Sequence, residues 1–124
     1  MDKIIRKEKL KNLDLILSNF VSYSQDFEDF ILFYLFYDKE RGFYIDVGAN
    51  DPNFISVTKA FYERGWYGIN IEPLPFKYEL LQKFRQRDIN IQIGVGKKKG
   101  NATLEITCPN GECSSMFYNY NNII

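Results

Sequence analysis

The sequence predicts an α/β fold built around a parallel sheet. Short runs rich in β-branched and aromatic residues alternate along the chain with segments in which apolar residues recur every three or four positions. The resulting order of strand, helix, strand, helix and strand favours parallel strands joined by right-handed crossovers. The length of 124 residues is that of a single domain. We therefore expect one open sheet with helices between its strands.

Two helices are expected ahead of the first strand. Apolar side chains at helical spacing predict a helix over residues 25–37, with Ser22 or Ser24 as its cap. An earlier helix is indicated over residues 3–17, where apolar residues share one side. Residues 1–40 are therefore interpreted as an N-terminal helical segment.

The first strand is expected over residues 43–47, because this apolar run has the composition of a buried strand. Gly48 then opens a turn. Asp51 and Pro52 predict the start of a helix that ends at Gly65. Aspartate can cap free N–H groups, and proline lacks only an N–H that would be unpaired at the first helical position.

Two further strands follow. Residues 66–72 predict the second strand, and a proline-containing turn leads into a helix that extends to about residue 86. Apolar and polar residues alternate over residues 89–95, which predicts a third strand with one wet face or a position at a sheet edge. Residues 97–100 predict a hairpin tip that leads into residues 102–107.

Regular patterning ends after Thr107. Turn-forming and asparagine-rich sequence follows, and we expect residues 108–124 to form an irregular tail. Residues 41–107 then constitute the α/β part of the chain, which is a half-domain with three parallel strands.

The amino-acid composition argues against several classes of function. Lysine plus arginine and aspartate plus glutamate number 16 each, so no overall field attracts nucleic acid, which is not expected as a partner. Residues 13–21 form the longest early apolar stretch, but they include an aspartate and two polar residues, so no signal peptide or membrane span is expected. The chain has two cysteines and no histidine, which excludes Ser-His-Asp and Cys-His catalysis and leaves no metal site. Cys108 and Cys113 are expected to be reduced thiols in a cytoplasmic protein.

Candidate binding residues lie at the carboxyl ends of the first two strands, where open α/β sheets bind ligands. The first strand leads into the run Asp46 to Asn50, and the second ends at Glu72. Gly48 lets the backbone come close to a ligand, and the Glu72 carboxylate can accept both hydroxyls of a ribose, which suits an adenosine-containing cofactor. A structural alternative stays open, in which Asp46 bonds the turn, Gly48 only forms it and Glu72 is a surface carboxylate.

Charge favours one cofactor over another at this edge. Dinucleotide folds place a pyrophosphate on a loop with three glycines, whereas this loop has one glycine and two carboxylates, Asp46 and Asp51. Two negative side chains disfavour a pyrophosphate. S-adenosylmethionine has no phosphate and carries an ammonium and a sulfonium, so the sequence favours this cationic cofactor.

Three spaced motifs occur along the chain, the runs Tyr23–Leu32, Gly42–Pro52 and Gly68–Pro75. Together they resemble the FkbM-type methyltransferase family, and the resemblance runs in register from Tyr23 to Ser115. It implies a Rossmann-like class I methyltransferase fold with S-adenosylmethionine as the methyl donor. It further implies a hydroxyl acceptor on a glycan or a small metabolite.

The resemblance assigns the candidate residues by position. Glu72 matches the ribose-binding acid, and the cofactor loop is matched by Asp46, Gly48, Ala49 and Asn50. A helix ahead of the sheet, which would cap the methionine end of the cofactor, is matched by Ser24, Gln25, Glu28 and Asp29. The sequence departs from the family at Pro52, where many members have glycine, and at Asp26-Phe27, which replaces Phe-Gly.

The same resemblance indicates what lies beyond this sequence. Family members continue with a strand bearing an Asp-x-Glu-Gly-like motif and complete a seven-stranded sheet of order 3-2-1-4-5-7-6. We therefore expect a fold truncated after the third parallel strand and a following hairpin. No catalytic base is identified, and no methyl transfer is expected from this chain alone. The first strand would have an open edge, through which the chain would self-associate.

Three functions remain open at this point. The chain is a methyltransferase with its other half supplied by a separate chain, an inactive gene fragment that retains at most weak cofactor binding, or a nicotinamide- or nucleotide-binding domain. The two carboxylates beside the loop disfavour the third, because they would repel a phosphate.

Overall fold

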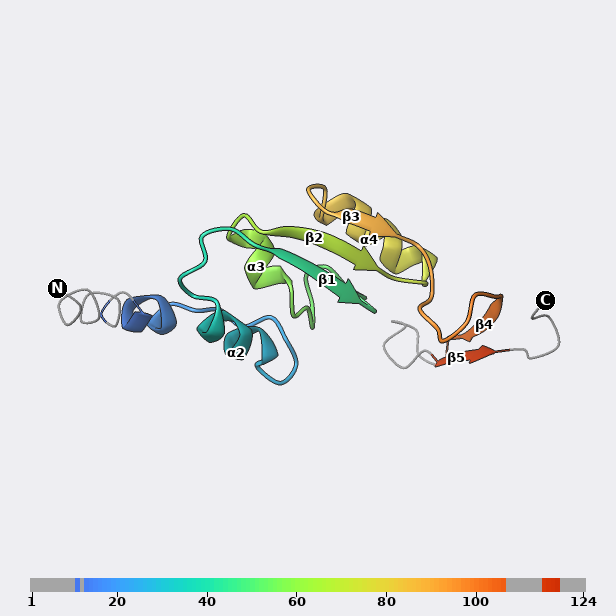
Figure 1. Ribbon diagram of the computed structural model, residues 1–124, viewed down its shortest axis with the longest axis horizontal. Helices are drawn as coiled ribbons and strands as arrows, with labels where there is room; N and C mark the ends of the chain where they lie inside the picture. Colours follow the sequence, from blue (N-terminus) through green and yellow to red (C-terminus); the bar gives the residue numbers. More distant parts are fainter. Residues whose placement is uncertain (1–10, 12, 107–114, 119–124) are drawn as a thin grey trace.

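The computed structural model describes residues 11, 13–106 and 115–118. Three strands form a parallel sheet in the order β1-β2-β3 (Figure 1). Their bounds are β1 (Phe43–Val47), β2 (Tyr67–Ile71) and β3 (Ile89–Ile91). The predicted parallel α/β architecture is confirmed, and β3 lies at an edge, as its alternation suggested.

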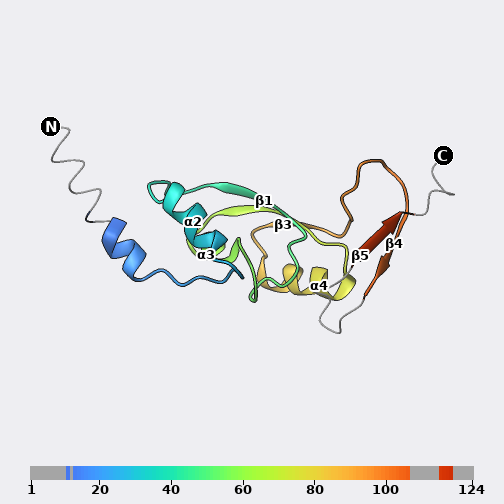
Figure 2. The same cartoon turned by 90° about the horizontal axis from the view of Figure 1, so that it is seen from below.

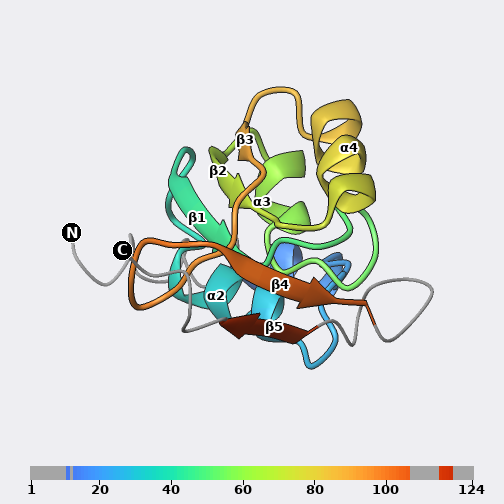
Figure 3. The ribbon, with the colours of Figure 1, turned by 90° about the vertical axis from the view of Figure 1, so that its right-hand side faces the viewer.

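Two helices connect consecutive strands, α3 (Lys59–Glu63) and α4 (Pro75–Phe84). Figure 3 looks along the strands and shows both helices on the same side of the sheet. This follows from the strand order, because two right-handed crossovers that step in the same direction place their helices on the same face. Among the described elements, none covers the opposite face.

The two faces of the sheet have opposite chemistry. Odd-numbered strand residues are all apolar and lie on the helix-free side, which we call the open face: Phe43, Ile45, Val47, Tyr67, Ile69, Ile71, Ile89 and Ile91. Even-numbered residues face the helices, since Asn90 donates to the carbonyls of Leu81 in α4 and of Arg85, which directly follows α4. The buried side therefore carries Tyr44, Asp46, Asn70 and Asn90, and the expectation that β1 is buried is wrong for its apolar residues.

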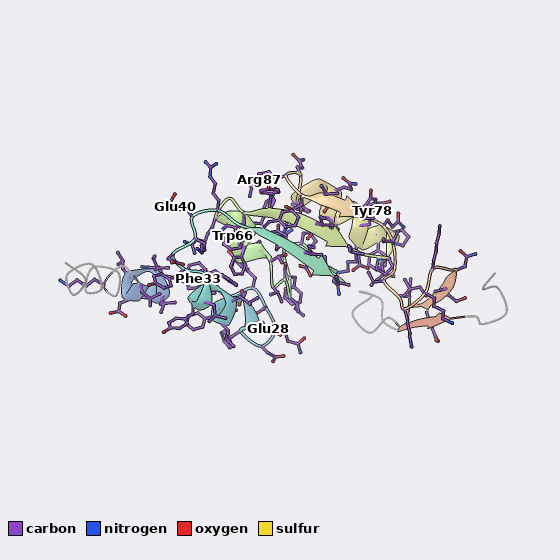
Figure 4. All side chains as sticks on the ribbon, in the orientation of Figure 1. Glu28, Phe33, Glu40, Trp66, Tyr78 and Arg87 are labelled. Carbon is purple, nitrogen blue, oxygen red and sulfur yellow. The ribbon has the colours of Figure 1, made fainter. Side chains whose placement is uncertain are left out.

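An aromatic core lies between α2 (Glu28–Leu35) and α3. Phe33, Phe61 and Trp66 are buried together, and Figure 4 labels Phe33 and Trp66. The rings of Phe61 and Trp66 have centroids 5.0 Å apart. This cluster fixes the N-terminal segment against the α/β layer. Residues 13–18 are also helical, which agrees with the predicted early helix over its described part.

The start of α2 differs from the prediction. The residue before the helix is Phe27, with φ of 60°, and it makes no side-chain cap. The hydroxyls of Ser22 and Ser24 instead donate to the buried carboxylate of Asp29, each at 2.7 Å. Burial raises the pKa of Asp29, but these and the backbone N–H bonds outweigh it and lower the pKa overall. The serines thus bind the helix mainly through the Asp29 carboxylate, and Ser24 Oγ also accepts the Asp29 N–H of the first turn at 3.4 Å, which agrees in part with the predicted cap.

The helix expected to begin at Asp51 and Pro52 begins only at Lys59. Asp51 does accept N–H bonds from the two residues that follow Pro52, as a cap would. The chain cannot continue as a helix, however, because Ile55 adopts φ of 51°, which lies in the left-handed region. Residues 51–58 therefore form an ordered loop above the sheet.

The C-terminal part also differs from the prediction. β4 (Ala102–Glu105) pairs antiparallel with β5 (Ser115–Tyr118) and not with β3, so residues 97–100 are not a hairpin tip. Glycines interrupt the segment after β3 and weaken its ability to extend the ladder. Figure 2 shows the β4–β5 pair apart from the parallel sheet, at one end of the molecule. A strand thus occurs where an irregular tail was expected, while Cys108 and Cys113 lie outside the described residues.

No helix in the described ranges has the length and apolar content that crossing a membrane requires.

Candidate functional site

The loop after β1 folds over the end of β2. The N–H groups of Gly48 and Ala49 both donate to the carbonyl of Ile71, at 2.8 and 3.2 Å. Gly48 has φ of 76°, which favours glycine, and a Cβ atom placed there would meet nothing within 4 Å. The loop therefore leaves free space beside Gly48.

Glu72 holds this loop to the loop after β2. One carboxylate oxygen accepts the Asn50 N–H at 2.8 Å and the other accepts the Leu74 N–H at 2.9 Å. The residue is only 4% exposed, so the alternative of a surface carboxylate is wrong. A carboxylate has about four acceptor sites, so roughly two remain for a ligand.

Asn50 adds an acceptor that the protein does not use. Its backbone has φ of 52°, and its side-chain Oδ1 is buried with no hydrogen-bond partner. Buried polar atoms in folded proteins almost always have partners, so an unpaired acceptor at this edge points to a ligand donor.

Asp46 lies on the helix-covered side of β1. Its carboxylate accepts the Thr58 hydroxyl at 2.7 Å. Burial raises the pKa of Asp46, and the Thr58 hydrogen bond and nearby Arg85 only partly oppose that shift. The side chain lines a cavity of about 540 Å³ between α2 and β1, with apolar walls that include Leu32 and Phe36.

Asp51 is already neutralised by a neighbouring cation. Lys77 from α4 lies 3.2 Å from its carboxylate, and both side chains are largely buried. Burial raises the pKa of Asp51, but the N–H bonds and Lys77 outweigh it, so the pKa is lowered. Asp51 is therefore not the free negative group that was expected beside the cofactor loop, because Lys77 balances its charge.

Glu28 is the first residue of α2 and Gln25 lies three residues ahead of it, and both are exposed. Figure 4 shows Glu28 at the end of α2 that is remote from the labelled core residues. In residues 13–106, no hydrogen bond joins either side chain to the 48–50 loop, and their assignment to the cofactor stays a prediction.

A buried arginine, which was not among the predicted site residues, holds the loop that follows the site. Arg85 donates to the carbonyl of Pro52 at 2.8 Å and to the hydroxyl of Ser56 at 2.9 Å, and it lies 4.0 Å from Asp88. It thereby ties the 51–58 loop to α4. A signal was present, because Arg85 follows Tyr78 and Leu81 at helical spacing and so falls on the core-facing stripe.

The residues that form this site lie within a range that matches a known protein family. A family model described as Methyltransferase FkbM domain matches residues 46–122, which is more than half of the chain. The match contains Gly48, Asn50 and Glu72, excludes Gln25, and continues beyond the point at Ser115 where the resemblance was expected to end. No curated protein and no solved structure matches the chain. The match covers more than half of the chain and includes the loop joined to Glu72, so the chain belongs to the FkbM methyltransferase family.

Proposed function

We propose that this chain binds S-adenosylmethionine at the carboxyl edge of the sheet, in the service of methyl transfer to a hydroxyl of a glycan or small metabolite. The observation that carries the proposal is the junction of the 48–50 loop with Glu72, within the range that matches the family. Family membership implies the donor, and the edge supplies groups that suit it.

The groups at this edge fit an adenosyl cofactor. The space beside Gly48 allows a ligand to approach the backbone, and the unused acceptor sites of Glu72 suit ribose hydroxyls. The unpaired Oδ1 of Asn50 can accept from an ammonium or a hydroxyl. Residues 48–50 and Glu72 would therefore hold the cofactor.

The contribution of these residues to the reaction is positional. When bound, S-adenosylmethionine supplies a methyl group activated by the positive sulfur. The 48–50 loop, held by Glu72 and by the Ile71 carbonyl, orients the reacting group, and such orientation lowers the barrier by restricting motion in advance. No described side chain is assigned as the base that takes the acceptor proton, because Asp46 is bonded to Thr58.

The proposed fold places β1, β2 and β3 as strands 1, 2 and 3 of a class I methyltransferase sheet. The observed order supports this, since strands 3-2-1 are adjacent in that topology. A nucleotide-binding domain is the second candidate, and the Asp51–Lys77 ion pair favours it, because it removes one charge that would repel phosphate.

Titration calorimetry of the full chain tests the choice. S-adenosylmethionine and S-adenosylhomocysteine are expected to bind and NAD is not. Binding of NAD alone would favour a nucleotide-binding domain. If none of the three ligands binds, the interpretation as an inactive fragment is the one that is left.

Gly48→Val is expected to lower S-adenosylhomocysteine affinity by more than tenfold. Valine at positive φ strains the loop by about 1–3 kcal/mol, and its side chain would occupy the space assigned to the ligand. Gly65→Val is a matched control, because Gly65 also has positive φ and open space but lies at the end of α3. A thermal melt of both variants measures the effect of backbone strain on stability, and calorimetry measures the effect on ligand affinity. If Gly48→Val and Gly65→Val lose the same affinity, the ligand does not bind beside Gly48.

A further inference from the structure

The open face of the sheet is a continuous unpartnered apolar surface in the described ranges. Five of its eight side chains are about half exposed or more, at 48% for Phe43, 62% for Ile45, 59% for Val47, 53% for Tyr67 and 58% for Ile89. The remaining three are isoleucines that are partly exposed. No polar or charged residue interrupts the surface, since every odd-numbered strand position is apolar.

Such a face is costly in water. Parallel sheets normally have both faces covered, whereas α3 and α4 cover only one side of this sheet (Figure 3). Soluble monomers rarely expose contiguous apolar patches above a few hundred Å². The five most exposed side chains alone leave on the order of 500 Å² in water, counting about half of each. The hydrophobic effect therefore favours a covering layer on this side.

We propose that the open face packs against the same face of a second copy, giving a two-fold dimer of stacked sheets. A two-fold interface must be complementary to itself, and a flat surface of aliphatic and aromatic side chains meets that condition without matched charges. Two sheets pack this way at about 10 Å separation. With its isoleucines the face approaches the roughly 800 Å² per partner that a stable interface buries.

This contact differs from the predicted pairing through the open edge of β1. Edge pairing would use the backbone of β1 alone, whereas face packing uses side chains of all three strands. Ile89 separates the two arrangements, because it lies on β3, at the opposite edge of the sheet from β1.

Sedimentation velocity of the full chain without ligand tests the proposal over a wide concentration range. The wild type is expected to dimerise, and Ile89→Lys is expected to raise the dissociation constant at least 100-fold. Ile31→Lys is the matched control, because Ile31 is also 58% exposed but lies on α2. This control is expected to dimerise like the wild type. Thermal melts of both variants check that each one folds.

Three results would overturn the proposal. The first is a wild-type chain that stays monomeric at all concentrations. The second is an Ile89→Lys variant that dimerises as tightly as Ile31→Lys, which would indicate the β1 edge. The third is a large assembly whose size neither substitution changes. None of these outcomes depends on cofactor binding, so the proposed function is tested separately.

Discussion

Arg85→Met is expected to lower the free energy of unfolding by about 3–5 kcal/mol, the cost of breaking a buried ion pair by removing one partner. The guanidinium is 2% exposed and lies 4.0 Å from the Asp88 carboxylate. Without it, Asp88 would keep its bonds from Tyr44 and Asn70 but lose its positive neighbour. The carbonyl of Pro52 would also lose its donor.

Arg87→Met is the control, two residues further along. Arg87 is exposed and lies over the ring of Tyr62, so its loss is expected to cost no more than about 1 kcal/mol. Urea denaturation of the two variants gives the comparison. Equal urea midpoints for the two variants would show that the buried cluster contributes nothing specific to stability. The midpoint of Arg85→Lys is expected to lie between those of Arg85→Met and Arg87→Met, because lysine keeps the positive charge but lacks the planar guanidinium group.

Glu72→Ala is expected to destabilise the chain by about 2–4 kcal/mol and to weaken S-adenosylhomocysteine binding by about 1–3 kcal/mol. The stability effect arises because the N–H groups of Asn50 and Leu74 would lose their acceptor. The binding effect has two sources, a looser 48–50 loop and lost ribose contacts. Denaturation and calorimetry measure the two quantities.

A ligand without ribose hydroxyls separates these sources. If Glu72 contacts the ribose, a dideoxy analogue of S-adenosylhomocysteine should bind the wild type more weakly, and Glu72→Ala should add little further loss. If Glu72 only supports the loop, the substitution should weaken the natural and dideoxy ligands equally. That second outcome would contradict the ribose assignment while leaving the cofactor proposal intact.

The strands could be predicted because composition and alternation are local properties. The observed β1 has the predicted bounds, and β2 lies within its predicted range. The buried face could not be chosen from alternation alone, since the rule that apolar side chains face the helices fails here. The polar side is buried because Asp88 and Arg85, distant in sequence from β1, bond to Tyr44.

The site shows the same division between local and distant information. Gly48, Asn50 and Glu72 could be brought together from sequence because parallel strands end at a common edge. The pairing of Asp51 with Lys77 could not, because it joins residues from different connections. The helix boundary at Lys59 depends on the backbone angle of Ile55, an isoleucine in a conformation that its side chain disfavours.

The polar underside of the sheet also affects the thermodynamics of unfolding. Exposure of apolar surface raises the heat capacity, whereas exposure of polar surface lowers it. When a single chain unfolds, much of the surface released beneath the helices belongs to Tyr44, Asp46, Asn70 and Arg85, and the open face is already hydrated. The heat capacity increment per residue should therefore fall below the usual value of about 12–15 cal/mol/K. A small increment flattens the stability curve, so warming or cooling from ambient temperature would change the stability of the monomer only slowly.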